Sequence, residues 1–313
     1  MPVLEYDPRQ FSLDDTLACG QAFRWERLPD GAWRGVVRDS IITLRQEGAR
    51  LHYAATTGDV EPLLRNLFLL DVDLPAIQAA LIAADPALAG PIARAPGLRL
   101  IRQDPDECLL SFICSTANQV PRIAAGIRRM SALLGPALDT IDGRTYHAFP
   151  SAAALAAADP ARLQAATGLG DRAGRLVEIG GQLVARGPGW LRGLGTVPYP
   201  VAHAALVGLR GVGPKVADCV CLFSLDHTEA VPVDTHIWQM AQQLWGRDHS
   251  GVPLAPGEKP SVKGLTGAAY RRVGDLFRAR YGALSGYAQV WLFYDHFRGY
   301  WGGTSPLLKA PAG

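Results

Sequence analysis

A tight connection between two helix-forming segments, at about residues 200–225, constrains the fold more than any other part of the chain. The run VAHAALVGL leads into RGVGP, and KVADCVCLFSL follows directly. Both runs have helical apolar spacing, and Gly211 and Gly213 can take left-handed backbone conformations that other residues avoid. We therefore predict a helix-to-helix hairpin with backbone N–H groups exposed along its turn.

The lysine after this turn stands at an unusual position. Lys215 lies in the first turn of the second helix, where the positive end of the helix dipole disfavours a cation. Asp218, three residues further on, is placed to neutralise it. Alternatively, the position favours a lysine that releases its proton readily and acts as a nucleophile. The turn is also a natural seat for a phosphate, although a helix hairpin without any ligand explains these few residues equally well.

The rest of the chain divides into a strand-rich and a helix-rich part. Short β-rich runs separated by turns occupy residues 23–56 and predict an antiparallel meander. From about residue 60 onwards the apolar residues follow helical spacing. The pattern predicts an α+β protein, with an N-terminal antiparallel sheet domain over 1–99 and a larger all-helical domain over 100–313. Three breaks are expected in the helical part, at 143–151, 186–200 and 246–267.

Composition narrows the classes of protein. A net charge of +2 and 48% hydrophobic residues describe a packed globular protein, and no apolar run approaches the length of a membrane span. Without a targeting pattern near residue 1, we expect a cytoplasmic location, or the nucleoid in a bacterium. The five cysteines lack CxxC spacing, which predicts reduced thiols and no metal site. Lysine is rare, and Lys215 alone falls in a structured turn.

The segment HTEAVPVDTHIWQM supplies a second candidate for chemistry. Asp234 precedes an amphipathic helical pattern, where helix capping is the commonest role of an aspartate. A glycine-rich hairpin ending in a lysine, followed about twenty residues later by PVD-x-H, is far more specific than either feature alone. This combination resembles the helix-hairpin-helix-GPD superfamily of DNA glycosylases.

Further segments are similar to the 8-oxoguanine DNA glycosylase/AP lyase branch of that superfamily. They span nearly the whole chain and include CGQAFRWERLPDGAWRGVV (19–37), LIRQDPDECLLSFICST (100–116), RTYHAFPS (144–151), GLGDRAGR (168–175) and GYAQVWLF (286–293). The lack of a terminal four-cysteine cluster separates the chain from the endonuclease III and adenine glycosylase branches. The resemblance implies a TBP-like sheet domain followed by two helical parts that meet at a cleft.

The resemblance also implies a bifunctional enzyme that excises 8-oxoguanine from duplex DNA in base excision repair. Lys215 would attack C1′ of the damaged nucleotide, expel the base and form a Schiff base, from which β-elimination breaks the strand. Asp234 would stabilise the cationic sugar in the transition state while capping its helix. Because the target atom is inaccessible within a duplex, the base must be flipped out.

Four residues are expected to hold the flipped base. Gln289 and Phe293 are four apart in a helical pattern, so an amide that reads a Watson–Crick edge shares a face with a ring that stacks. Cys219, one helical turn after the lysine, would close the other side. By resemblance, the carbonyl of Gly20 accepts the N7 hydrogen that 8-oxoguanine has and guanine lacks. Without the resemblance, a core phenylalanine, a surface glutamine and a buried thiol are the simpler interpretation.

A third group would contact the strand opposite the lesion. Arg122 and Arg172 match the family's pair that holds the orphaned cytosine, a task that suits the fixed fork of arginine donors. Solvated surface arginines are the alternative. Relatives often carry an asparagine that fills the vacated space and a wedging tyrosine, where this chain has Ala117 followed by Asn118, and Asp171. Both departures predict a weaker preference for cytosine opposite the lesion.

Phosphate contacts are expected at Gly211, Gly213 and His236, although a histidine two residues past a helix cap is often only a surface residue. We expect that no cofactor is required, and the binding of a monovalent cation at the helix hairpin is left open. The expected partner is double-stranded DNA containing oxidised guanine, bound by a monomer without membrane contact. Two alternatives remain: an alkylpurine DNA glycosylase, which usually acts without a hairpin lysine, and a non-catalytic helix-hairpin-helix module that only binds DNA.

Overall fold

The computed structural model describes residues 2–7, 9–115, 118–247, 259, 261 and 263–300. It contains a five-stranded antiparallel sheet with the strand order β1-β5-β4-β3-β2. The predicted meander over 23–56 is confirmed, because β2 to β5 follow one another along the chain and in the sheet. The strands are β1 (Val3–Glu5), β2 (Trp25–Arg27), β3 (Trp33–Val37), β4 (Ser40–Glu47) and β5 (Arg50–Ala55).

Alternating apolar residues give the sheet one buried face. Leu44 of β4 pairs with Tyr53 of β5, and both side chains lie in a core that also contains Trp33 and Phe68. The short helix α1 (Leu13–Ala18) contributes Leu13 and Leu17 to the same core. Its N-cap is Ser12, whose hydroxyl accepts a hydrogen bond from the Asp15 N–H. Residues 19–23, which contribute to the site described below, therefore follow directly after a firmly packed helix.

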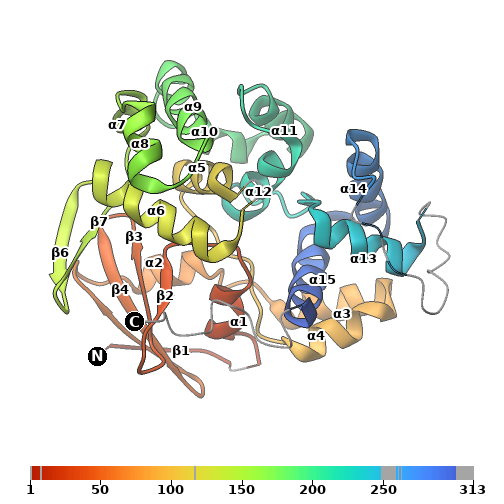
Figure 1. Cartoon of the computed structure of the whole chain (residues 1–313). Helices are drawn as coiled ribbons and strands as arrows, with labels where there is room; N and C mark the ends of the chain where they lie inside the picture. The colour runs from red at the N-terminus through yellow and green to blue at the C-terminus, as the bar shows by residue number, and fades with distance from the viewer. Residues whose placement is uncertain are drawn as a thin grey trace.

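Helices make up most of the remainder and confirm the predicted α+β class. Figure 1 shows α7 to α12 above the sheet, and α3, α4 and α15 to one side of it. None of the described helices combines the length and apolarity that a membrane span needs. The α-helices are α2 (Glu61–Leu67), α3 (Leu74–Ala84), α4 (Ala89–Arg94), α5 (Pro105–Ser115), α6 (Val120–Leu134), α7 (Ala152–Ala156), α8 (Pro160–Thr167), α9 (Arg172–Arg186), α10 (Trp190–Gly193), α11 (Tyr199–Val207), α12 (Pro214–Ser224), α13 (Thr235–Trp245), α14 (Gly267–Tyr281) and α15 (Ser285–Tyr300), with short 3₁₀ turns η1 (Pro86–Leu88), η2 (Leu194–Thr196) and η3 (Gly282–Leu284).

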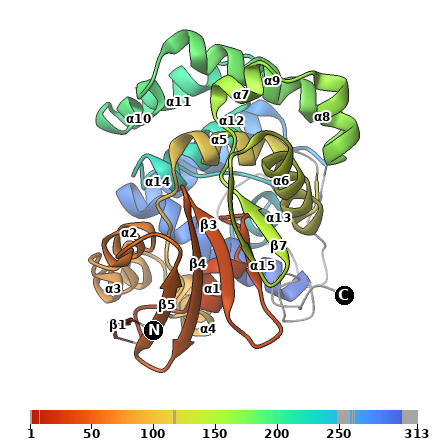
Figure 2. The same ribbon diagram turned by 90° about the vertical axis from the view of Figure 1, so that its left-hand side faces the viewer.

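A β-hairpin interrupts the region that the sequence predicts to be all-helical, so that prediction is wrong at this point. Strands β6 (Ala137–Ile141) and β7 (Arg144–His147) pair with each other and lie beside the main sheet in Figure 2. Asp142 and Gly143 between them both have positive φ, at 53° and 76°. An Asp-Gly pair with two positive φ angles is the preferred two-residue hairpin turn. Tyr146 then packs on the outer side of β3 and β4.

The other two predicted breaks have different outcomes. Residues 186–200 contain two short helical turns, α10 and η2, although the segment was expected to lack regular structure. Gly187 and Gly189, with φ of 84° and 80°, separate α10 from the end of α9. Much of 246–267 lies outside the described residues.

The large helical core includes residues that precede the predicted domain boundary. Leu74, Leu81 and Ile92, from α3 and α4, are buried among the side chains of the helical part. Arg94 binds Asp295 of α15 through two hydrogen bonds of 2.5 and 2.7 Å. The N-terminal segment therefore contacts the C-terminal helix directly, and the division at residue 99 stays a prediction.

The helix hairpin forms as predicted, from α11 and α12. Gly211 has φ +95°, and a side chain there would also meet Ile179, 3.6 Å away. Gly213 differs from the prediction, because its φ is −90° and it acts as the N-cap of α12 in an extended conformation. No side chain caps this helix, so its first N–H groups stay available along the turn.

Candidate active site

A pocket of about 380 Å³ lies where the start of α12, the end of α5, α15 and the segment after α1 converge. It brings together all six residues that the sequence places in catalysis or in base binding. A larger cleft of about 1050 Å³ between β2, α6 and β7 contains none of those six. The smaller pocket is lined by Cys19, Gly20, Gln21, Phe112, Lys215, Cys219, Phe223, Pro232, Asp234, Gln289, Val290 and Phe293.

Lys215 extends from the second position of α12 into this pocket. Pro214 occupies the first position, where its missing N–H costs no helical hydrogen bond. The Nζ atom lies 3.4 Å from the hydroxyl oxygen of Ser115 and 5.1 Å from the ring centre of Phe112. An amine with one hydroxyl partner and an aromatic face beside it, in a pocket wall, can reach an electrophilic carbon of a bound substrate.

Asp218 does not neutralise this lysine, so the simpler explanation offered by the sequence is wrong. Its buried carboxylate accepts hydrogen bonds from the hydroxyls of Tyr199, at 2.6 Å, and Tyr270. His203 Nε2 lies 3.7 Å from the same carboxylate. Burial raises the pKa of Asp218, although His203 and the two hydroxyls oppose that shift. Its partners come from α11 and α14, which the sequence spacing within α12 could not reveal.

Asp234 caps α13, as predicted. Its Oδ1 atom accepts hydrogen bonds from the N–H groups of His236, at 3.0 Å, and Ile237, at 2.9 Å. These bonds fix the carboxylate in the pocket wall. A fixed anion in a partly enclosed site is suited to stabilising positive charge that develops on a substrate.

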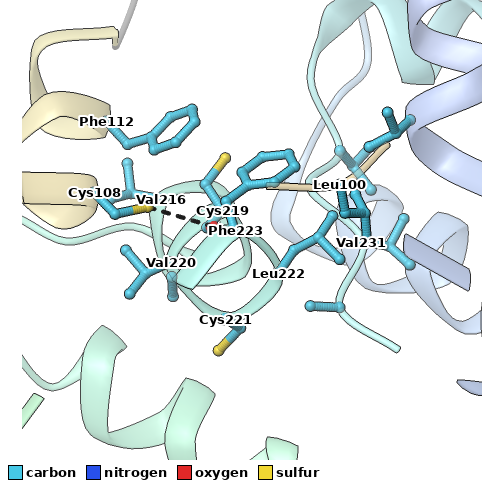
Figure 3. Close-up of a cluster of buried hydrophobic side chains, with 14 of the residues drawn as sticks. Leu100, Cys108, Phe112, Val216, Cys219, Val220, Cys221, Leu222, Phe223 and Val231 are labelled. Carbon is cyan, nitrogen blue, oxygen red and sulfur yellow. Dashed lines mark hydrogen bonds between the residues drawn. The ribbon is translucent and has the colours of Figure 1, made fainter. Parts of the chain in front are cut away.

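Cys219 lies one turn after the lysine and is fully buried. Figure 3 shows its side chain on the same side of α12 as Phe223, next to Phe112, while Cys221 points the opposite way. Burial raises the pKa of the Cys219 thiol to about 12, against the opposing influence of the Lys215 ammonium. The thiol is therefore uncharged at neutral pH and acts as a small apolar wall.

Gln289 is buried, with only 4% of its surface exposed, which excludes the surface glutamine of the simpler interpretation. Its Nε2 atom donates to the carbonyl of Pro232 at 3.4 Å. Its Oε1 atom is buried and has no hydrogen-bond partner among the described residues. Such an acceptor costs stability unless a ligand satisfies it. Phe293, four residues on, lines the same pocket and provides a ring face.

Gly20 has φ +86°, in the left-handed region that favours glycine. A Cβ there would lie 3.9 Å from Cε1 of Phe293. The next residue, Gln21, holds this peptide in place: its side chain donates to the Arg99 carbonyl at 2.7 Å and accepts from the Ile101 N–H at 3.1 Å. The orientation of the Gly20 backbone is therefore fixed by buried hydrogen bonds.

The sequence reasoning did not select several residues that line the pocket or contact Lys215. Phe112 stacks on Phe223, with ring centres 5.6 Å apart, and Ser115 contacts the lysine. Both Phe112 and Ser115 belong to the run SFICS, which lies within one of the segments that are similar to the family. That similarity was the signal by which the sequence could have identified them. Gln21 likewise sits in the CGQAF run.

Two of the predicted opposite-strand residues lie near the end of α5: Asn118, which follows that helix, and Arg172, the first residue of α9. Asn118 donates a hydrogen bond to the carbonyl of Cys114 at 3.3 Å. Burial raises the pKa of the Cys114 thiol to about 12, and the positive charge of Arg172 opposes that shift. Ser115, the residue after Cys114, contacts Lys215. Arg122 is exposed on α6. The predicted group is thus adjacent to the pocket, at least through Asn118 and Arg172.

Asp171 occupies the position where a wedging tyrosine was expected in relatives. Its carboxylate lies 2.6 Å from Arg175 and 3.9 Å from Arg172, and its side chain is 71% exposed. The Asp171 carboxylate therefore competes with the orphaned cytosine for Arg172, the arginine to which the resemblance assigns that contact. Ala117, the other departure, lies outside the described residues.

The predicted phosphate contacts are at two helix N-termini. Gly211 and Gly213 form the turn before α12, and His236 lies in the first turn of α13, with its ring 5.7 Å from Phe293. All five cysteines are buried free thiols. Within the described parts of the chain, no group of three or more His, Cys, Asp and Glu side chains is arranged to hold a metal ion.

Comparisons with known proteins identify the family to which the chain belongs. Residues 3–109 match the family 8-oxoguanine DNA glycosylase, N-terminal domain. The N-glycosylase/DNA lyase OGG1 of Arabidopsis thaliana is 33% identical over 293 residues, covering 91% of this chain and 77% of the relative. The N-glycosylase/DNA lyase of Saccharomyces cerevisiae is 32% identical over 265 residues, covering 77% and 70%.

A solved structure extends the likeness to three dimensions. The Clostridium acetobutylicum 8-oxoguanine glycosylase/lyase, in complex with double-stranded DNA containing cytosine opposite 8-oxoG, aligns with a TM-score of 0.80 and 30% identity over 93% of both chains. Identity of this level over most of both chains, together with the shared fold, establishes common membership. This chain belongs to the 8-oxoguanine DNA glycosylase family of N-glycosylase/DNA lyases.

Proposed function

We propose that this protein excises 8-oxoguanine from double-stranded DNA and then cleaves the strand at the abasic site through a lysine Schiff base. One observation carries the proposal: Gln289, whose buried Oε1 atom has no hydrogen-bond partner among the described residues, lines the same pocket as Lys215. The Watson–Crick edge of a guanine-type base offers N–H donors that such an acceptor binds. Family membership supports the same substrate.

The proposed chemistry uses groups that the pocket already holds. The uncharged amine of Lys215 forms a bond to C1′ as the C1′–N9 bond breaks, and the base leaves with the bonding electrons and takes up a proton. Opening of the sugar ring gives the Schiff base, and loss of a C2′ proton then expels the 3′ phosphate. Asp234, held by the N-terminus of α13, stabilises positive charge on the sugar throughout.

Discrimination against guanine is assigned to the backbone of Gly20. Its carbonyl accepts the N7 hydrogen that only the oxidised base carries. The left-handed φ of this residue and the buried bonds of Gln21 support that role, because a carbonyl can select a hydrogen only if its direction is fixed. Phe293 stacks on the base, and the neutral Cys219 thiol closes the other side.

The two alternatives fit the pocket less well. An alkylpurine glycosylase has no use for the amine that Lys215 places in the pocket wall. A non-catalytic DNA-binding module has no use for a buried glutamine acceptor beside a lysine and a fixed aspartate. On the proposal, Arg122, Arg172 and Asn118 contact the opposite strand. The turn formed by Gly211 and Gly213 binds one phosphate, and His236 contacts another.

Borohydride trapping tests the proposal directly. The wild-type protein, incubated with a duplex containing 8-oxoguanine opposite cytosine, is expected to give a covalent protein–DNA adduct on reduction. Lys215→Gln should bind the duplex and give no adduct. Lys263→Gln, which changes an exposed lysine outside the pocket, is the matched control and should be trapped like the wild type. An adduct with Lys215→Gln, or an intact lesion in a duplex that the wild type binds, would refute the proposal.

A further inference from the structure

The side chain of Tyr270, on α14, lies between the two parts of the chain that carry the proposed catalytic groups. Its hydroxyl donates a hydrogen bond to the buried carboxyl group of Asp218, which follows Lys215 by one turn of α12. The backbone carbonyl oxygen of Val231 lies 3.4 Å from the same hydroxyl. Val231 is three residues before Asp234, in the segment that leads into α13. One hydroxyl group therefore contacts both α12 and the segment that carries the aspartate.

Residues 231–233 are buried although they belong to no helix or strand. Their backbone polar groups therefore need partners outside the segment. The Tyr270 hydroxyl and the Gln289 amide each lie 3.4 Å from one of its carbonyl oxygens. Burial raises the pKa of Tyr270, and the backbone N–H of Val233 acts in the opposite direction. The hydroxyl is therefore protonated at neutral pH, and its oxygen lies close to both donor and acceptor groups of this segment.

The cap of α13 does not by itself place Asp234 with respect to the lysine. The hydrogen bonds from the N–H groups of His236 and Ile237 fix the carboxylate only relative to its own helix. Lys215 belongs to α12, so a second contact must hold the start of α13 relative to α12. Two groups that act on one sugar depend on their separation, and a misplacement of about 1 Å can cost about a hundredfold in rate.

Tyr199 provides an internal comparison. Its hydroxyl donates to the other oxygen of the Asp218 carboxyl group, at 2.6 Å, from α11. Each tyrosine therefore supplies one hydroxyl donor to the same buried acceptor. Among the residues that the structure describes, the Tyr199 hydroxyl forms hydrogen bonds with Asp218 and Arg278, and with none of residues 231–234. The two hydroxyls differ in whether they contact the segment before Asp234.

We propose that Tyr270 is a positioning residue for excision: its hydroxyl ties residues 231–234 to α12 and so holds Asp234 at the separation from Lys215 that the substrate requires. This rests on the proposed function, because it assumes that both groups act on one sugar. Tyr270 is absent from the pocket lining, so its effect on the reaction passes through the aspartate. Without the hydroxyl, the ring stays packed but the segment can move relative to the lysine.

Two substitutions remove one hydroxyl each from the same buried carboxyl group. Tyr270→Phe and Tyr199→Phe keep both rings, and each leaves Asp218 with one donor fewer. Both variants should lower the midpoint of urea unfolding by similar amounts. Tyr270→Phe alone should slow single-turnover excision of 8-oxoguanine opposite cytosine, by about ten- to thirtyfold. The Kd for a duplex with an uncleavable abasic analogue should stay at the wild-type value in both variants.

A double-mutant cycle tests whether Tyr270 acts through Asp234. Asp234→Asn removes the charge, and asparagine still caps a helix. In this background Tyr270→Phe should cause little further slowing, because the group that it positions has already lost its charge. Tyr199→Phe in the same background is the control and should leave the rate of Asp234→Asn unchanged.

The outcomes distinguish this inference from the proposed function. If the wild type excises 8-oxoguanine and Tyr270→Phe does so equally fast, the positioning role is wrong and the enzyme assignment stands. If Tyr199→Phe slows excision as much as Tyr270→Phe, the loss comes from the buried Asp218 and the inference is overturned. Losses from Tyr270→Phe and Asp234→Asn that multiply in the double variant overturn it as well. If the wild type binds DNA and leaves the lesion intact, the proposed function itself fails.

Discussion

The Nζ atom of Lys215 lies 3.4 Å from the hydroxyl of Ser115, joining the start of α12 to the end of α5. The hydroxyl gives this amine a hydrogen-bond partner that holds it in place. We therefore expect Ser115→Ala to slow excision by about two- to tenfold, because the loss of one hydrogen bond leaves the amine less well placed for attack on C1′. Single-turnover excision rates measure this loss. Ser151→Ala, at the N-cap of α7, is the control, and an unchanged rate in Ser115→Ala would contradict the argument.

Gln289 should affect the excision of the damaged base and not the cleavage of the strand at the abasic site. Gln289→Met keeps the length of the side chain and removes the partnerless acceptor. We expect excision of 8-oxoguanine to slow by about ten- to a hundredfold, the range for one specific base contact, while cleavage of a preformed abasic site continues at the wild-type rate. Parallel assays on the two substrates give the comparison. Equal losses on both would indicate a damaged pocket and would argue against base recognition by this residue.

Gly20 permits a test with a matched backbone control. Alanine at this position is strained by about 1 kcal/mol because of its positive φ, and its Cβ would contact Phe293. Gly143→Ala introduces similar strain in the β6–β7 turn, where no atom lies within 4 Å. Both variants should lose comparable stability in urea unfolding. Only Gly20→Ala should lose discrimination between 8-oxoguanine and guanine, and a similar loss in Gly143→Ala would mean that global stability sets the activity.

The preference for the opposite base should be weak and should depend on Asp171. This carboxylate contacts Arg175 and lies near Arg172, so it withdraws charge from the proposed cytosine contact. We expect cleavage rates on duplexes with C, T, G or A opposite the lesion to differ less than in an enzyme with free arginines. Asp171→Asn should raise the preference for cytosine. A strict cytosine requirement in the wild-type protein would contradict this prediction.

Asp218 should make the protein lose stability as the pH rises. Its pKa is raised in the folded state by burial, so the folded protein holds a proton that the unfolded chain releases at lower pH. The free energy of unfolding therefore falls as the pH rises from the ordinary aspartate value, about 4, through the raised value. Asp218→Asn removes this titration and should flatten the curve. Urea unfolding of both proteins between pH 4 and 7 measures the slopes, and parallel curves would exclude the effect.

Local patterns were enough to predict much of this site. The glycine turn placed Lys215 at the start of a helix, the position of Asp234 before an amphipathic run identified a cap, and four-residue spacing put Gln289 and Phe293 on one face. Each of these depends on residues close in sequence. The meander over 23–56 was predictable for the same reason, because hairpin strands pair with their neighbours along the chain.

Partners distant in sequence were not predictable from the residues themselves. Asp218 is held by Tyr199 and Tyr270, 19 positions before it and 52 positions after it, and neither spacing follows from helix geometry. Ser115 reaches Lys215 across 100 positions. The β6–β7 hairpin is a different case, because its Asp-Gly turn was a readable signal that the surrounding helical patterns outweighed.

The pocket takes one wall from residue 20 and another from residue 293, and this has a consequence for how the protein is made. A chain that ends at α12 contains Lys215 but neither Gln289 nor Phe293. The wall that these two residues supply is therefore added last, with α15, after the segment that carries the amine has already been made.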